Sequence, residues 1–516
     1  MAMLSNLNAF AHQKTENPFR WEISFPTNLK LRNARVFQSF ESAIIINTTA
    51  RLTRWTTSGI QGDLAEKWNV SSDGKKIHFF LRRDGRFSDG SIITASDVIW
   101  SVQRHFALRG QLFDEFSSVI EGANQIKSPE AVVAGLHSLN DFEFVVTLNQ
   151  PSRKIIDWLF GTLPTSIFKK NSISSTEDEI NPGYPSSGLY VIKDFSHKSV
   201  VLELNKYHWL ANEKGLIKEV LITPSGKDDL LQKLLDNQTD YARKVFSSRI
   251  NKAELTRKGL QFISMEPVCM FLRANFAGPI LSKYGGIAPI VQHLVDREKL
   301  VDSLDNNLFI TKPKPMYSWS GRIETIEKQF GKIPSDQILE FKKTLQQNYS
   351  EVFAGKSALK IGIAKDSAEL SEVGTKLVHQ LKQLGVNSET VFRQQADISA
   401  AEQDNSTDFT LTSYELSSDE PALTLPYLVG LNPLRMHLPQ NHKVYQYKKR
   451  FTTWPRLEHQ VEIIKEFNII MRKEGIIVPL LVDDNYSVFS DRFDISRVPS
   501  YTFYWRLSDL RVKGLQ

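Results

Sequence analysis

The side chains best suited to chemistry are histidines and paired carboxylates, and neither group has the spacing of a catalytic or metal site. The eleven histidines are scattered along the chain. His437 and His442 lie close together, but Pro439 breaks any helix there, so they cannot form the i,i+4 pair of a zinc-binding face. The carboxylate pairs at 419–420 and 483–484 are adjacent in sequence, which is typical of a solvated surface. We therefore expect no metal and no cofactor.

Enzyme motifs are also absent from the sequence. It contains no phosphate-binding loop, no dinucleotide-binding glycine pattern, no zinc-protease helix motif and no nucleophile elbow. The single cysteine, Cys269, lies in the apolar run Val268–Phe271, where a thiol usually acts as a small hydrophobic group, and one thiol cannot form an intramolecular disulfide. We expect a protein that is not an enzyme.

Composition indicates a globular protein with more than one lobe. The 516 residues are 41% hydrophobic and 24% charged, with a net charge of +6. No apolar run approaches the roughly 18–20 residues of a membrane span, and the longest, Ala43–Ile46 and Gly475–Val482, have the length of buried strands. The densest basic cluster, Lys448–Arg450, is too short for a nucleic-acid surface, so we expect no nucleic-acid partner.

Local signals between Gly62 and Arg104 predict a hairpin followed by a helix. Asp73-Gly74 is a hairpin signal, because Gly reaches positive φ without steric cost. The run 77–82 alternates apolar and other residues, as a half-buried strand does. Thr94 with an acid at Asp97 has the form of a helix N-cap. We expect this segment to be structural and to touch no ligand.

A series of short elements in this segment resembles a family signature. The elements are Leu64–Trp68, Ser72–Gly74, Ile77–Arg82, Phe87–Gly90, Thr94–Ala95 and Asp97–Val98. In this order and spacing they closely resemble the signature of extracellular solute-binding proteins of the peptide/nickel-binding class, family 5, which capture cargo for ABC importers. Oligopeptide- and dipeptide-binding proteins are members of this class.

The resemblance continues to both sides of the signature. It is carried by Ser187–Tyr190, Val201–Trp209, Leu230–Asp240, Phe271–Phe276 and Ile290–Glu298. The segment Leu230–Asp240 resembles the family's amphipathic helix and the turn that follows it, but Asn237 stands where the family has Gly. Beyond these segments, Leu359–Ile363 is predicted as a strand and Ser371–Val386 as a helix that stops at Gly385.

The resemblance implies an α/β fold, the two-lobed periplasmic-binding-protein fold of type II, cluster C-like, with an inserted third subdomain. The implied boundaries are 1–46 for the first part of lobe I, 47–186 for the inserted subdomain, 187–270 for the second part of lobe I, 271–483 for lobe II and 484–516 for the return to lobe I. Such proteins normally carry a signal or lipid anchor. The chain begins Met1-Ala-Met-Leu4, so we expect a mature form from which that leader was removed; the alternative is a cytoplasmic protein.

The segment Asp408–Pro421 resembles the family's pocket strand. Tyr414 takes the position of a Trp that packs beside the ligand in peptide-binding relatives, and Ser413 and Glu415 flank it. In those relatives the backbone of this strand pairs with an extended peptide by β-augmentation. We expect these residues to contact the ligand.

This strand departs from the family at the charged positions. Ser417 stands where an Asp neutralises the α-ammonium of a peptide, and Leu411 where some relatives have a carboxylate-binding Arg. A buried, unpaired ammonium costs several kcal/mol. Either Asp419 or Glu415 takes over, or the ligand has no free α-amine, and we expect the second.

Other ligand-site candidates are aromatic or polar residues at positions that the resemblance places near the cleft. They are Phe37, Gln38, Ser39, Phe113 and Trp319. Aromatic rings here could stack on a ligand, although each suits the core as well. Nickel-binding relatives make a metal ligand worth naming, but the scattered histidines argue against it.

The function implied by the resemblance is capture of a solute by a monomeric substrate-binding protein, in the periplasm or on the cell surface as a lipoprotein. Its partners would be an ABC permease and ATPase, and membrane contact would occur only through them or through a removed lipid anchor. The expected ligand is peptide-like, such as a modified peptide or a saccharide conjugate. The alternative is a ligand-sensing or scavenging domain of the same fold without its own transporter.

Overall fold

The chain forms two compact units. The first comprises Met1–Arg243, Arg257–Phe262 and Val488–Gln516, and the second Lys244–Thr256 and Ile263–Ser487. The computed structural model describes residues 18–515 except 24, 26–28, 35–38, 111–112, 153, 162–164, 225–229, 247, 249, 307, 310, 317–333, 354, 366, 394–404, 416–437, 439–440, 445, 448–456 and 500–504. The assignment of 47–186 to a separate subdomain stays a prediction.

The first unit contains a mixed sheet with the strand order β11-β1-β10-β9-β8. β1 (Phe19–Ile23) runs parallel to both β10 (Glu219–Pro224) and β11 (Tyr241–Phe246). β9 (Val200–Leu204) pairs antiparallel with β10 and with β8 (Tyr190–Phe195). α4 (Leu230–Leu235) precedes Asn237, which adopts φ 56, so Asn supplies the left-handed conformation for which the family uses Gly.

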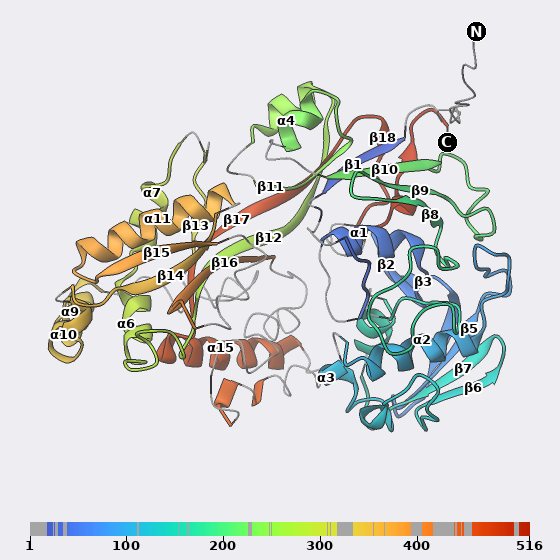
Figure 1. Ribbon diagram of the computed structural model, residues 1–516, viewed down its shortest axis with the longest axis horizontal. Helices are drawn as coiled ribbons and strands as arrows, with labels where there is room; N and C mark the ends of the chain where they lie inside the picture. The colour runs from blue at the N-terminus through green and yellow to red at the C-terminus, as the bar shows by residue number, and fades with distance from the viewer. Residues whose placement is uncertain are drawn as a thin grey trace, which may run out of the picture. The chain divides into compact units, whose positions relative to one another are not determined.

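A second, antiparallel sheet of the first unit has the order β4-β5-β7-β6. Its strands are β4 (Ala65–Val70), β5 (Lys76–Leu81), β7 (Glu143–Thr147) and β6 (Leu136–Asn140), and α2 (Ala95–Ala107) lies beside it (Figure 1). In β5 every second residue is buried, so one face of the sheet belongs to the core. The other elements of this unit are α1 (Ser39–Thr48), β2 (Thr53–Thr56), β3 (Gly59–Gly62), α3 (Phe113–Phe116), η1 (Ala123–Gln125), η2 (Ile155–Leu159), β18 (Phe493–Asp494), η6 (Leu507–Asp509) and β19 (Arg511–Val512).

The hairpin and helix predicted from the signature segment are confirmed. Gly74 has φ +69 in the turn between β4 and β5. The carboxylate of Asp97 accepts hydrogen bonds from the backbone N–H and the hydroxyl of Thr94, at 2.9 and 2.7 Å, at the start of α2. From the far end of α2, the buried Arg104 donates to Ser174, Asn33 and Glu177, so the helix also organises two surrounding loops.

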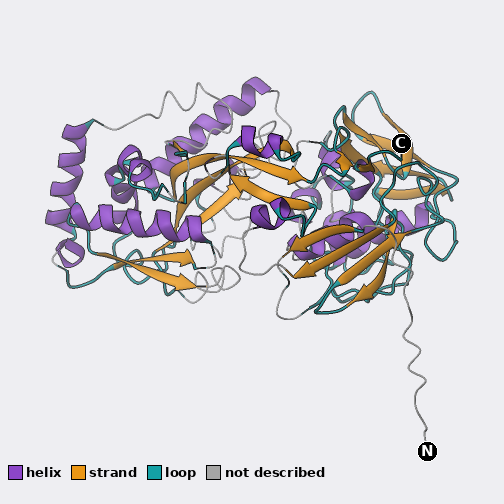
Figure 2. Cartoon of the chain, turned by 90° about the horizontal axis from the view of Figure 1, so that it is seen from above, coloured by secondary structure: helices purple, strands orange, loops and turns teal. Residues whose placement is uncertain are grey.

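The second unit is built on the strand order β15-β14-β16-β12-β17, with β13 on β17. Its strands are β15 (Ser388–Arg393), β14 (Leu359–Ala364), β16 (Phe409–Glu415), β12 (Gln261–Ala274), β17 (Ile477–Phe489) and β13 (Lys314–Pro315). Its helices are α5 (Lys252–Arg257), α6 (Ile287–Leu294), α7 (Arg297–Asp302), α9 (Ser335–Asn348), α10 (Ser350–Phe353), α11 (Ala368–Gln383) and α15 (Leu457–Glu474). α11 and α15 lie on opposite sides of these strands in Figure 1. Figure 2, in which the chain is seen from above, also shows helices around the strands of this unit.

Two expectations about this chain are wrong, and two are confirmed. Ala43–Ile46 is not a strand but part of α1; its residues are buried all round, so no helical period is visible in the sequence. Asp483 is not a solvated surface group, because it is buried and accepts a hydrogen bond from the Ser248 hydroxyl. The strand predicted at 359–363 is β14, and the helix predicted at 371–386 is α11, followed by Gly385 at φ +86.

Candidate functional site

β16 is a strand with two different faces. Phe409 and Leu411 are fully buried in an apolar cluster that includes residues of α11 and β14. On the opposite face, Tyr414 is half-buried and packs against a second cluster formed by β12, α15 and the start of β17. This alternation follows from the two-residue period of a strand. Leu411, at the position of a carboxylate-binding Arg in some relatives, is therefore held in the core and cannot contact a charged ligand group.

The two neighbours of β16 pair with it over different lengths. β12 is antiparallel to the whole strand, from the pair Ala274–Phe409 to the pair Val268–Glu415. β14 is parallel and pairs only at Phe409 and Thr410. Among the described residues, the segment 411–413 therefore has a strand partner on the β12 side alone. An open strand edge of this kind presents backbone N–H and C=O groups that can pair with an added strand.

The surroundings of Tyr414 are apolar and rich in sulfur. Its partner in the β12 register is Cys269, whose Sγ lies 3.0 Å from Sδ of Met316. The described polar side chains on β16 carry hydroxyl groups, as in Thr412 and Ser413, and none of the described side chains on this strand is charged. The strand can thus offer backbone pairing, neutral hydrogen bonds and an aromatic surface.

The structure describes some of the predicted site residues and not others. Ser413, Tyr414 and Glu415 come together on β16, although the side chain of Glu415 lies outside the described residues. Phe113, in α3 of the first unit, is half-buried, 5.8 Å from the Phe106 ring and 4.1 Å from the Arg109 guanidinium. Ser39 begins α1, but its side chain is not described. The remaining predicted residues lie outside the described part of the chain, namely Phe37, Gln38, Ser417, Asp419 and Trp319.

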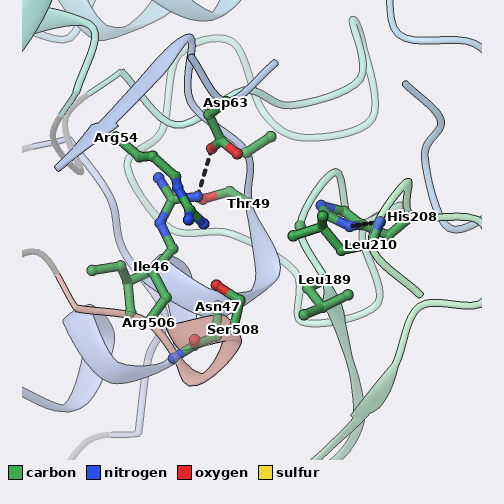
Figure 3. Close-up of a pocket in the computed structure, with 12 residues that line it drawn as sticks. Ile46, Asn47, Thr49, Arg54, Asp63, Leu189, His208, Leu210, Arg506 and Ser508 are labelled. Carbon is green, nitrogen blue, oxygen red and sulfur yellow. Dashed lines mark hydrogen bonds and ion pairs between the residues drawn. The ribbon is translucent and has the colours of Figure 1, made fainter. Parts of the chain in front are cut away.

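A polar pocket in the first unit was not expected from the sequence. It is lined by the end of α1, by β2, by loops near Asp63, Leu189 and His208, and by the segment from Arg506 to Ser508 (Figure 3). Its free space suffices for about one water molecule, which is too small for a peptide-like ligand. We therefore regard it as part of the stabilising framework of this unit.

Charged groups dominate this pocket. The Asp63 carboxylate lies 2.5 Å from the Arg506 guanidinium, and both side chains are almost completely buried. Burial by itself raises the pKa of Asp63, but the neighbouring Arg506 and Arg54 outweigh it and hold the pKa below its ordinary value. Arg54 in turn lies 3.7 Å from Asp509. The only sequence signal for the Asp63–Arg506 pair is the position of Asp63 at the start of the signature, because the two residues are 443 positions apart.

His208 borders the same pocket as a neutral ring. Its Nδ1 accepts a hydrogen bond from the Leu210 N–H at 3.1 Å, which assigns the ring proton to Nε2. Burial lowers the pKa of His208 to about 3, and the nearby Arg506 and Arg82 add to this effect against the attraction of Asp63.

The described residues contain no candidate metal centre. No group of three or more His, Cys, Asp or Glu side chains in this part of the chain could hold a metal ion. His442 instead pairs with Glu474 at 2.5 Å, and His437 lies outside the described residues. None of the described helices combines the length and the apolar character that a membrane span requires.

Comparisons with known proteins give the wider relationship. The sequence matches the family of bacterial extracellular solute-binding proteins, family 5 Middle, over residues 59–432. It is 26% identical over 170 residues to the periplasmic oligopeptide-binding protein OppA of Escherichia coli, which is 31% of each chain. It is 23% identical over 286 residues to the oligopeptide-binding protein OppA of Bacillus subtilis, covering 53% of this chain and 50% of that protein. The chain thus matches between 31% and 50% of the length of these curated relatives.

Solved structures share the fold over nearly the whole chain. The Haemophilus influenzae OppA complex with the peptide RPPGFSPFR has a TM-score of 0.78 at 14% identity, covering 97% of this chain and 99% of that one. The murein tripeptide binding protein MppA of Escherichia coli has a TM-score of 0.76 at 16% identity, covering 96% and 98%. The expected α/β fold of the two-lobed periplasmic binding proteins is therefore confirmed. Because the family match extends over most of this chain, from residue 59 to residue 432, the chain belongs to the family 5 bacterial extracellular solute-binding proteins.

Proposed function

We propose that this protein binds a peptide-like solute along β16 and delivers it to the permease and ATPase of an ABC importer, without catalysing a reaction. The observation that carries the proposal is the segment 411–413, which is paired with β12 on one side and lies beyond the end of the ladder with β14. An extended ligand can add to such an edge through main-chain hydrogen bonds. The relatives named above bind oligopeptides or a murein tripeptide, and we place this protein, like them, in the periplasm or at the cell surface.

The ligand that fits this strand best has blocked or absent peptide termini. Ser417 stands where relatives have an Asp for the α-ammonium, and the Leu411 side chain is buried in the core. A neutral hydroxyl can accept a hydrogen bond, but it cannot offset the cost of burying an unpaired ammonium. A modified peptide, a cell-wall fragment or a saccharide conjugate does not incur that cost.

Calorimetric titration with two matched peptide libraries tests this proposal. Both contain mixed di- to pentapeptides, one with free termini and one N-acetylated and C-amidated. We expect the blocked library to bind at least as tightly as the free one. Sub-micromolar binding of free peptides that disappears on N-acetylation, or on Asp419→Asn, would contradict the proposed preference for blocked termini. It would show that Asp419 neutralises the α-ammonium in place of the Asp that is missing at position 417. If neither library binds, native mass spectrometry for co-purified small molecules decides whether the protein holds a solute at all.

Tyr414→Ala is expected to weaken binding of the blocked library about tenfold, because a partly exposed aromatic ring next to the segment 411–413 is lost. The free energy of unfolding should fall by about 1–2 kcal/mol, since part of the ring packs against the α15 cluster. Calorimetric titration and thermal unfolding measure the two effects.

Tyr447→Ala is the matched control, because Tyr447 is buried in the same cluster but does not belong to β16. It should cost about 3–5 kcal/mol of stability and leave the affinity unchanged. Equal losses of stability in the two variants, with unchanged binding in both, would assign Tyr414 to the core alone.

A further inference from the structure

Asp408 lies immediately before β16 and has a fully buried carboxylate. Its Oδ1 accepts hydrogen bonds from the backbone N–H groups of Ile280 and Leu281, at 2.6 and 2.9 Å. Its Oδ2 accepts one from the backbone N–H of Lys360, at 3.0 Å. The donors belong to two different segments, the turn that follows β12 and the beginning of β14. One side chain thus connects all three strands that define the open edge.

The backbone at this position makes the same connections. The Asp408 N–H donates to the Lys360 carbonyl, and the Asp408 carbonyl accepts from the Asn275 N–H, both at 2.8 Å. The side-chain NH2 group of Asn275 also donates to the carbonyl of Thr407, at 3.0 Å. A Cβ atom at Gly278 would lie 2.8 Å from Oδ1 of Asp408 and 2.5 Å from the Thr407 carbonyl oxygen, so this turn approaches more closely than a side chain permits.

These bonds hold β16 in one register. A slip by one residue would turn every side chain to the other face, moving Leu411 out of its core cluster and Tyr414 into it. After such a slip Thr407 or Phe409 would face the three N–H donors, and neither has a carboxylate. Buried backbone donors without an acceptor are costly, so the slipped arrangement is strongly disfavoured.

We infer that Asp408 is a positioning residue for ligand capture: by joining β12, β14 and β16 it sets which residues of β16 form the open edge. The inference rests on the proposed function for its consequence, because Asp408 acts through the strand and does not itself contact the ligand. The buried carboxylate, its three donors and the register are properties of the protein without ligand, and they can be tested separately.

Asp408→Asn is the direct test, because the two side chains have nearly the same shape. In either orientation an NH2 group replaces one oxygen, so at least one N–H donor loses its acceptor. We expect amide hydrogen exchange of residues 409–415 in the ligand-free protein to accelerate by about tenfold or more, since an unsatisfied buried donor is costly. Gly278→Ala, which crowds Oδ1 from the other side, should have the same localised effect.

Asp296→Asn is the matched control, because Asp296 is another carboxylate of this unit that accepts from a backbone N–H, that of Lys299 at the start of α7. It should leave exchange in 409–415 unchanged. The positioning role is overturned if Asp408→Asn and Gly278→Ala accelerate exchange in 409–415 no more than Asp296→Asn does. It is also overturned if exchange accelerates uniformly over the whole unit.

A second measurement separates this inference from the proposed function. With the blocked library as probe, Asp408→Asn should weaken binding about tenfold or more, in parallel with the faster exchange, whereas Asp296→Asn should not. Faster exchange in 409–415 with unchanged binding would keep the register role but overturn its link to capture. Absence of binding in the parent protein would count against the proposed function. The hydrogen-exchange result would then decide by itself whether Asp408 holds the register of β16.

Discussion

Asp63→Asn is expected to lower the free energy of unfolding by about 3–5 kcal/mol. The substitution leaves the Arg506 guanidinium buried without the carboxylate that lies 2.5 Å from it. It also weakens the acceptor of the Arg51 backbone N–H, since Asp63 Oδ2 accepts that bond at 3.2 Å. Differential scanning calorimetry of the parent and the variant at neutral pH measures the loss.

Asp84→Asn provides the matched control for Asp63→Asn. Asp84 forms an ion pair with Arg82 at 3.1 Å in the same unit, but its side chain is 61% exposed. Exposed ion pairs contribute little, so this variant should be nearly neutral. The double variant Asp63→Leu with Arg506→Met should recover much of the stability, because apolar groups of similar size need no countercharge. Equal effects of Asp63→Asn and Asp84→Asn would contradict the assignment of a buried, essential pair.

Local sequence signals predicted the elements whose causes are local. The capping pair Thr94 and Asp97 and the turn at Gly74 depend on residues within a few positions of one another, and both form as expected. The alternation of β16 likewise follows from its sequence, because Leu411 and Tyr414 have opposite parity along the strand. A strand long enough to show its period therefore indicates which face each candidate residue occupies.

The features that sequence reasoning missed depend on contacts between distant segments. Ala43–Ile46 is apolar at every position, so its pattern suits a buried strand and a buried helix equally. Among the described residues the pairing of β16 with β14 ends at Thr410, and no residue of β16 encodes where that pairing ends. The roles of Asp63 and His208 depend on Arg506, which reaches them only when the C-terminal segment returns to the first unit.

Acid is expected to destabilise the protein through His208. The folded state keeps the pKa of this ring at about 3, chiefly because it is buried, whereas an unfolded chain has a histidine pKa of about 6.5. Below about pH 6.5 the unfolded state therefore binds a proton that the folded state rejects. The free energy of unfolding should fall by about 1.4 kcal/mol per pH unit between about pH 6.5 and pH 3, a loss of about 2 kcal/mol by pH 5. Urea unfolding followed by circular dichroism at a series of pH values measures this slope.

His208→Asn isolates the contribution of the ring, because the Asn carbonyl can still accept the hydrogen bond from the Leu210 N–H but does not titrate. Its loss of stability between about pH 7 and pH 5 should be smaller than that of the parent by about 2 kcal/mol. His197→Asn, at an exposed histidine of the same unit, should follow the parent curve. If the curves of His208→Asn and the parent run parallel over this range, the acid sensitivity arises elsewhere and His208 is not held neutral by its burial beside Arg506.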